Sequence, residues 1–158
     1  NYPAAFDIGL YIGQTDNVQL QLNNISVLPK DILVLLEDKN ENNFYNLCDS
    51  ACVKTKLEAG TTNGKYRIHL VKAKAIYNLH QDYSGVYLWE DNERILLYGD
   101  GVHELQEIRV WNKEHELIEE KEYNGGIIVF DDNIRSGRYS VDLKIEGQWI
   151  EHYPIEVK

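Results

Sequence analysis

The fold is decided by residues 136–158, which read Ser-Gly-Arg-Tyr-Ser-Val-Asp-Leu-Lys-Ile-Glu-Gly-Gln-Trp-Ile-Glu-His-Tyr-Pro-Ile-Glu-Val-Lys. Apolar residues occupy every second position from Tyr139 to Ile145, which is the pattern of a strand with one buried face. A second alternating run extends from Trp149 to Val157 and is interrupted at Glu151. The Gly147-Gln148 step between the runs suits a tight two-residue turn. This stretch therefore predicts an antiparallel hairpin.

Other short apolar or alternating runs, bounded by polar residues, Gly or Pro, predict further strands. These runs are residues 18–22, 32–36, 53–57, 65–71, 85–89, 95–98 and 127–130. The run 32–36 is continuous and too short for a helix, which predicts a strand covered on both faces. Residues 40–43 are typical of a polar loop and 60–64 of a turn, whereas residues 1–14 allow no assignment.

The segment 103–122 fits two different structures. Leu105, Ile108 and Trp111 recur at steps of three, and the Glu, Lys and Leu content favours an amphipathic helix. The alternation of Ile108 with Val110 and the hairpin signal at residues 124–125 favour strands instead. Periodicity alone leaves both structures open.

The composition limits the partners. Among 158 residues, 26 Asp and Glu against 16 Lys and Arg give a net charge of −10, so nucleic acid is not expected as a partner. No run of about 18 apolar residues is present, so we expect no membrane-spanning segment. The sequence starts without Met or a basic and apolar leader, so any export signal is expected to be removed or to lie outside it.

Motifs of catalysis are missing. The sequence has no Gly-x-Ser-x-Gly, no Walker loop and no His-Glu-x-x-His, so we expect no enzyme activity, no cofactor and no metal site. His69 is expected to be packed or exposed rather than catalytic, and the acidic clusters at 37–38, 91–93 and 131–133 are expected to be solvated loops. Trp89, Trp111 and Trp149 offer an aromatic platform for sugars, although core packing explains them better.

Cys48 and Cys52 are the two cysteines and have the spacing Cys-x-x-x-Cys. A disulfide requires the two Cα atoms to lie within about 7 Å, which a loop that turns back would allow. The spacing leaves open a disulfide, two free thiols and, least favoured, a metal site.

Two stretches resemble a known family. Residues 134–143, followed by a turn and a last apolar strand that ends in Lys158, resemble the C-terminal sorting domain of proteins exported by the Bacteroidota type IX secretion system. Residues 108–118 are similar to an upstream hairpin of that family, which favours strands over a helix in 103–122. Arg135 and His115 depart from the family pattern, since a proline and a turn glycine are common at these positions.

The N-terminal half carries a second, more diffuse resemblance. Residues 6–9, 36–39 and 66–70 are similar to the β-sandwich that commonly precedes the sorting domain in exported proteins of this system. Strand pattern and resemblance together predict an all-β chain of two tandem immunoglobulin-like antiparallel β-sandwiches. The predicted domains are residues 1–78 and 79–158.

The resemblance implies a function without catalysis. The chain would be the secretion-signal and surface-attachment region of an exported protein, or a retained component of the secretion apparatus. The implied partners are the outer-membrane type IX machinery and lipopolysaccharide, and the implied location is the cell surface, the outer membrane or, in transit, the periplasm. The residues at the positions implied to be recognised are Gly137, Tyr139, Lys144, Gly147, Val157 and Lys158. Ser50 matches the Asp-Ser/Thr-apolar O-glycosylation pattern of that phylum. A carbohydrate- or protein-binding adhesive β-sandwich module is the alternative.

Overall fold

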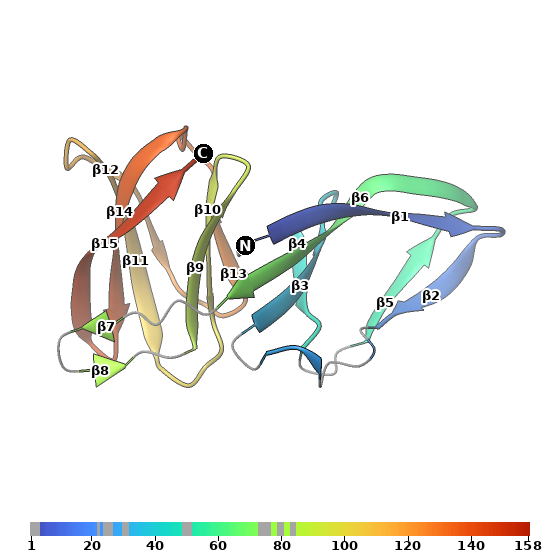
Figure 1. The fold of residues 1–158 in the computed structure, drawn as a ribbon, viewed down its shortest axis with the longest axis horizontal. Helices are drawn as coiled ribbons and strands as arrows, with labels where there is room; N and C mark the ends of the chain where they lie inside the picture. Colours follow the sequence, from blue (N-terminus) through green and yellow to red (C-terminus); the bar gives the residue numbers. More distant parts are fainter. Residues whose placement is uncertain are drawn as a thin grey trace. The chain divides into compact units, whose positions relative to one another are not determined.

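The computed structural model describes residues 4–21, 23, 27–29, 32–48, 52–72, 77–78, 81–82 and 85–158. These residues form strands and turns, with no α-helix among them (Figure 1). The chain divides into two compact units, Asn1–Lys72 and Ala73–Lys158, whereas the sequence placed the division after residue 78. The described part contains no helix that is long and apolar enough to cross a membrane. The all-β class predicted from the strand pattern is therefore confirmed.

The first unit contains two antiparallel sheets. The larger sheet has the order β1-β6-β3-β4, formed by β1 (Ala4–Ile12), β6 (Gly60–Lys72), β3 (Ile32–Asp38) and β4 (Asn43–Asn46). The smaller sheet pairs β2 (Asp16–Leu20) with β5 (Val53–Leu57). Both sheets contribute to one apolar core, whose buried residues are Ile32, Val34, Leu36, Leu47, Val53, Leu57 and Tyr66. The apolar halves of the alternating strands therefore face each other between the two sheets.

Several boundaries in the first unit differ from those predicted. Strands β1 and β4 had not been predicted, and the turn predicted at residues 60–64 is wrong because β6 begins at Gly60. All seven residues of β3 are buried, which confirms a strand covered on both faces. Glu37 and Asp38 belong to this strand, so the expectation that they lie in a solvated loop is also wrong.

In the described part of the second unit, seven strands form two larger sheets in a sandwich-like arrangement. One sheet has the order β13-β10-β9, formed by β13 (Ile127–Phe130), β10 (Arg94–Gly99) and β9 (Val86–Asp91). The other has the order β12-β11-β14-β15, formed by β12 (Leu117–Glu122), β11 (Leu105–Asn112), β14 (Gly137–Ile145) and β15 (Gln148–Val157). A separate short pair consists of β7 (Tyr77–Asn78) and β8 (Gln81–Asp82).

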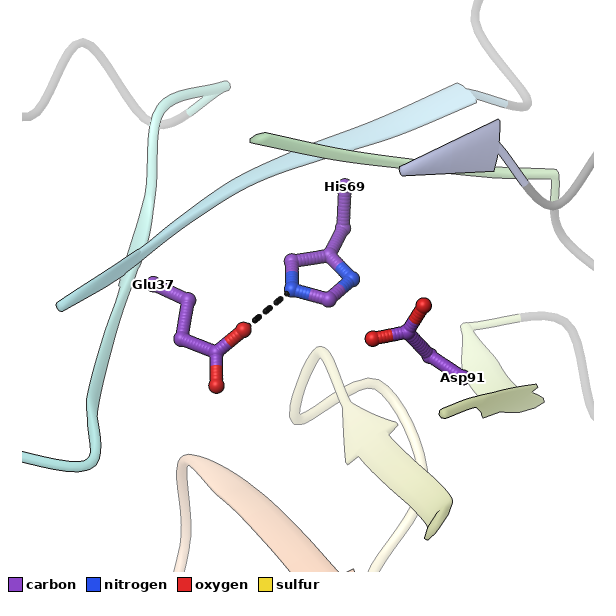
Figure 2. A group of neighbouring side chains, drawn as sticks. All are labelled: Glu37, His69 and Asp91. Atoms are coloured by element: carbon purple, nitrogen blue, oxygen red, sulfur yellow. Dashed lines mark hydrogen bonds and ion pairs between the residues drawn. The ribbon is translucent and has the colours of Figure 1, made fainter. Parts of the chain in front are cut away.

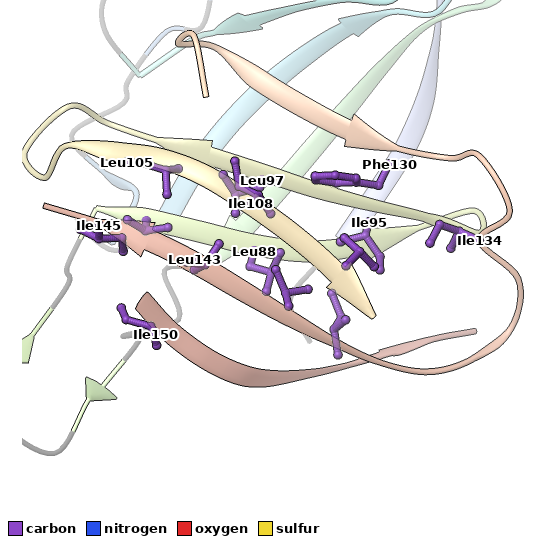
Figure 3. Packing of buried hydrophobic residues seen from close by; sticks show 14 of the residues in the cluster. Leu88, Ile95, Leu97, Leu105, Ile108, Phe130, Ile134, Leu143, Ile145 and Ile150 are labelled. Carbon is purple, nitrogen blue, oxygen red and sulfur yellow. The ribbon is translucent and has the colours of Figure 1, made fainter. Parts of the chain in front are cut away.

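The core of the second unit lies between its two larger sheets (Figure 3). The core residues alternate along most strands, as predicted for β14, but β11 and β15 shift register, so that β15 buries Ile150 rather than Trp149 of the predicted alternating run. The buried members are Val86, Leu88, Ile95, Leu97, Leu105, Ile108, Val110, Phe130, Ile134, Val141, Leu143, Ile145, Ile150, Ile155 and Val157. Burial of this apolar set is the main force that stabilises the unit.

The segment that the periodicity left open forms the β11–β12 hairpin, so the helix hypothesis is wrong. Asn112 closes the turn, because its side-chain oxygen accepts hydrogen bonds from the backbone N–H groups of Glu114 and Glu116, each at 2.9 Å. His115 adopts a left-handed backbone with φ of 61°, a conformation that favours glycine.

Two other turns were predicted imperfectly. Glu146 and Gly147 join β14 to β15, with φ of 52° and 78°, so the turn lies one residue earlier than predicted. Two positive φ angles are those of a type I′ turn, which suits the twist of a hairpin. Residues 124–125 do not close a hairpin, because β12 pairs with β11 whereas β13 pairs with β10. This loop instead carries the chain from one sheet to the other.

Candidate functional site

The three stretches that carry the N-terminal resemblance lie next to one another in the fold. They fall on β1, on β3 with the residue after it, and on β6, which is the middle strand of the three. Asp7 on β1 forms ion pairs with Lys39 at 3.1 Å and with Arg67 on β6 at 3.2 Å. These charged residues therefore fasten neighbouring strands at the surface of the sheet.

The pKa of Asp7 should depend on this contact. The hydrogen bond from Lys39 lowers the pKa of Asp7, desolvation opposes the change, and the charges of Lys39 and Arg67 add to the lowering. We expect Lys39→Ala to raise the pKa of Asp7 toward its ordinary value, measured by NMR titration of the side-chain carboxyl. A lowered pKa adds stability above the unfolded-state pKa, and this contribution is lost as the pH falls through the folded-state value. Lys54→Ala, on the other sheet, is the control, and an unchanged Asp7 titration in Lys39→Ala would contradict the assignment.

Glu37 and His69 form a buried pair in the same unit. Each is 1% exposed, and His69 Nε2 lies 2.8 Å from a carboxylate oxygen of Glu37 (Figure 2). The two residues lie on adjacent strands, and the neighbouring Asp38 pairs with Lys65 at 3.3 Å. His69 is therefore packed, as expected. Pairing offsets the unfavourable free energy of burying two polar side chains.

The six residues implied to be recognised all lie on β14, on β15 or beside them. Gly147 and Lys158 are exposed and Lys144 is half-buried. Val157 is buried in the core and pairs with Gly137 across the two strands. The turn at Gly147 and Lys158 are therefore accessible to solvent, whereas Val157 is buried and contributes to the fold.

Tyr139 also acts through the fold. Its hydroxyl accepts a hydrogen bond from the backbone N–H of Arg135 at 2.9 Å and donates one to the Arg135 carbonyl at 3.0 Å. The two bonds close the corner that leads into β14. Arg135 supplies the N–H for the first of these bonds, which a proline at this position could not do.

The face of the four-stranded sheet opposite the core carries a row of alternating charges. Arg109 bonds Glu107 at 2.8 Å and Glu120 at 3.3 Å, and Lys144 lies 3.6 Å from Glu107. The hydrogen bond to Glu120, followed by the charges of both carboxylates, raises the pKa of Arg109. The Arg109 guanidinium also stacks 4.1 Å from the ring centre of Trp149. The charges on this face therefore neutralise one another.

The three tryptophans do not form one platform. Trp89 lies on β9 of the three-stranded sheet and is buried, whereas Trp111 and Trp149 lie on the other sheet and are half-buried. None of them belongs to the apolar core between the sheets, so the expectation of core packing does not explain Trp111 and Trp149. Because the core-facing residues alternate with them, Trp89 and the other two face away from opposite sides of the sandwich.

Asp142 is a buried acidic residue that the sequence did not single out. It is 6% exposed, and its carboxylate accepts hydrogen bonds from Trp111 Nε1 and from the backbone N–H of His152, both at 2.7 Å. The pairing of β14 with β15 shifts register at this point, and His152 has φ of 62°. The break in alternation at Glu151 was the signal of this bulge in the sequence.

The cysteines are free in the structure, so the disulfide between Cys48 and Cys52 is not formed. The Cys48 thiol instead lies against β3, where it accepts a hydrogen bond from Val34 N at 3.3 Å and donates one to the Ile32 carbonyl at 3.7 Å. Ser50, the residue of the glycosylation pattern, lies outside the described residues.

Comparisons with known proteins identified no relatives: no protein-family model matches this chain, and no curated protein matches it.

Proposed function

We propose that this chain is a non-catalytic export signal of the type IX kind, in which the second unit is an immunoglobulin-like sandwich presented to the outer-membrane machinery. Its seven strands, lettered A, B, C, C′, E, F and G along the chain, form the sheets A-B-E and C′-C-F-G. That division, with a tyrosine at the start of strand F bonded to the backbone just upstream, is typical of such sandwiches. In this proposal the first unit, whose core lies between two sheets, is the other sandwich of the tandem.

One observation carries the proposal: the residues of the resemblance build the β14–β15 hairpin, whose turn and last residue, Lys158, are accessible. The turn at 146–147 and Lys158 are exposed, and β15 is the last strand in its sheet order. An edge strand offers unpaired backbone groups to a partner. Pro154 and the bulge at His152 interrupt the hydrogen-bonding pattern along this edge. They hinder nonspecific strand pairing in the middle of β15, so recognition is confined to its two ends.

The adhesive alternative has less support on this surface. A sugar that stacks on Trp149 would have to displace Arg109 from the ring, and Trp111 Nε1 is already bonded to Asp142. We assign this chain no catalytic role, because its sequence lacks the motifs of the common catalytic sites. The exported protein would reach the cell surface, where it is released from the signal and attached to lipopolysaccharide or retained with the apparatus.

The test is a reporter fused in front of the full 158-residue chain in a bacterium with a working type IX system. We expect the reporter at the cell surface in this strain and inside the periplasm in a matched strain without the outer-membrane translocon. Protease accessibility on intact cells measures the surface fraction. Equal accessibility in both strains would overturn the proposal, and binding of the purified chain to a glycan array through Trp149 would favour the adhesive alternative.

A further inference from the structure

Two histidines meet on the second unit, away from the tip of the terminal hairpin. His115 lies in the turn between β11 and β12, and His152 lies in the bulge of β15. Their ring centres are 6.0 Å apart, and the rings are nearly perpendicular, at 71°. Both residues are exposed, so the two imidazoles are open to solvent.

A buried carboxylate binds the backbone of one of the two histidines and lies near its ring. Asp142 accepts the backbone N–H of His152 at 2.7 Å, and the same carboxylate oxygen lies 3.8 Å from Nδ1 of the His152 ring. A small rotation of the ring would bring Nδ1–H into hydrogen-bonding distance of Asp142. In metal sites this arrangement is common, because a carboxylate on one ring nitrogen orients the other toward the ion.

Both histidines are held in a backbone conformation that side chains seldom adopt. His115 has φ of 61° and His152 has φ of 62°. A left-handed conformation is unfavourable for most residues, and glycine adopts it without strain. The turn and the bulge impose this backbone conformation, and together they bring the two rings to one place.

We propose that His115 and His152 bind one divalent transition-metal ion such as Zn²⁺, with Asp142 as the residue that orients His152. With zinc–nitrogen bonds of about 2.0–2.1 Å and tetrahedral angles, two imidazoles on one zinc have ring centres about 5 Å apart. The observed 6.0 Å is therefore within a small side-chain movement of a shared ion. Glu114, Glu116 and Glu151 flank the histidines in sequence and are exposed, so the local charge favours a cation.

The proposal is tested by titrating Zn²⁺ alone into the full chain by isothermal titration calorimetry. The background replaces both free cysteines, Cys48→Ser and Cys52→Ser, because a thiolate would compete for zinc. We expect one site of micromolar affinity. His115→Gly and His152→Ala should each weaken binding by about tenfold or more, since even residues that only orient ligands contribute that much. His103→Ala, elsewhere in the same unit, should leave the affinity unchanged.

His115→Gly decides the outcome even if other variants fold poorly. Glycine tolerates the left-handed backbone at 115, so this variant should melt at or above the temperature of the parent while losing zinc. NMR shifts of both imidazole rings on zinc addition should accompany binding in the parent. Parent protein that binds no zinc at millimolar concentration, or His115→Gly that binds it with parental affinity, would overturn the proposal.

Discussion

Phe130→Ala is expected to lower the free energy of unfolding of the second unit by about 3–5 kcal/mol. Phe130 ends β13, is 0% exposed and lies in the core between the two sheets (Figure 3). Its truncation removes apolar contacts and leaves a cavity that the sheets cannot fully close. This is a large fraction of the stability of an ordinary domain, so the variant should be partly unfolded at physiological temperature.

Urea denaturation followed by tryptophan fluorescence measures this loss. All three tryptophans lie in the second unit, so the signal reports that unit alone. Leu117→Ala is the control, because Leu117 is 45% exposed on β12 of the same unit and should change the stability by less than about 0.5 kcal/mol. Equal effects of the two substitutions would show that the apolar core is not where the structure places it.

Asp142→Ala is expected to destabilise the second unit by about 2–4 kcal/mol. The substitution leaves the Trp111 Nε1–H and the His152 backbone N–H without their acceptor, and buried donors that lose a partner retain the full cost of desolvation. The side chain of Trp111 should then lose its fixed orientation, which a blue or red shift of its fluorescence would report.

The measurement is again urea unfolding, with Glu151→Ala as the control. Glu151 is an exposed acidic residue beside the same bulge, so its removal tests for a general effect of negative charge. The account predicts little change in the control. A loss in Asp142→Ala as small as that in Glu151→Ala would mean that the Asp142 hydrogen bonds do not hold β15 in place.

Local patterns in the sequence predicted much of the fold. The alternation from Tyr139 to Ile145 predicted β14 and its buried face, because a strand with one apolar side repeats every two residues. The continuous run at 32–36 predicted the fully buried β3 for a related reason. The segment 103–122 was different, since its apolar spacing satisfied a helix and a hairpin equally, and the resemblance favoured the strands that the structure contains.

What the sequence missed depends on long-range pairing. β1 was not predicted because its strand character comes from pairing with β6, whose partner residues lie 48 to 66 positions later in the chain. Residues 124–125 carry a hairpin signal, yet the strands on either side pair with other partners. The contacts of Asp142 with Trp111 and His152 also join residues that are distant in the sequence. The interruption of the apolar alternation at Glu151 was therefore the one local sequence signal of that cluster.

The central claim is that the secretion machinery recognises the folded β14–β15 hairpin at its exposed turn and at Lys158. The most direct measurement is the surface fraction of the reporter fusion that carries Lys144→Ala and Lys158→Ala. Lys144 is half-buried, Lys158 is exposed, and neither belongs to the apolar core. The matched control replaces Lys54 and Lys113, two exposed lysines that lie off this hairpin. The account predicts that the hairpin variant melts like the parent but reaches the surface severalfold less, while the control is delivered normally. Normal surface delivery of the hairpin variant would contradict it.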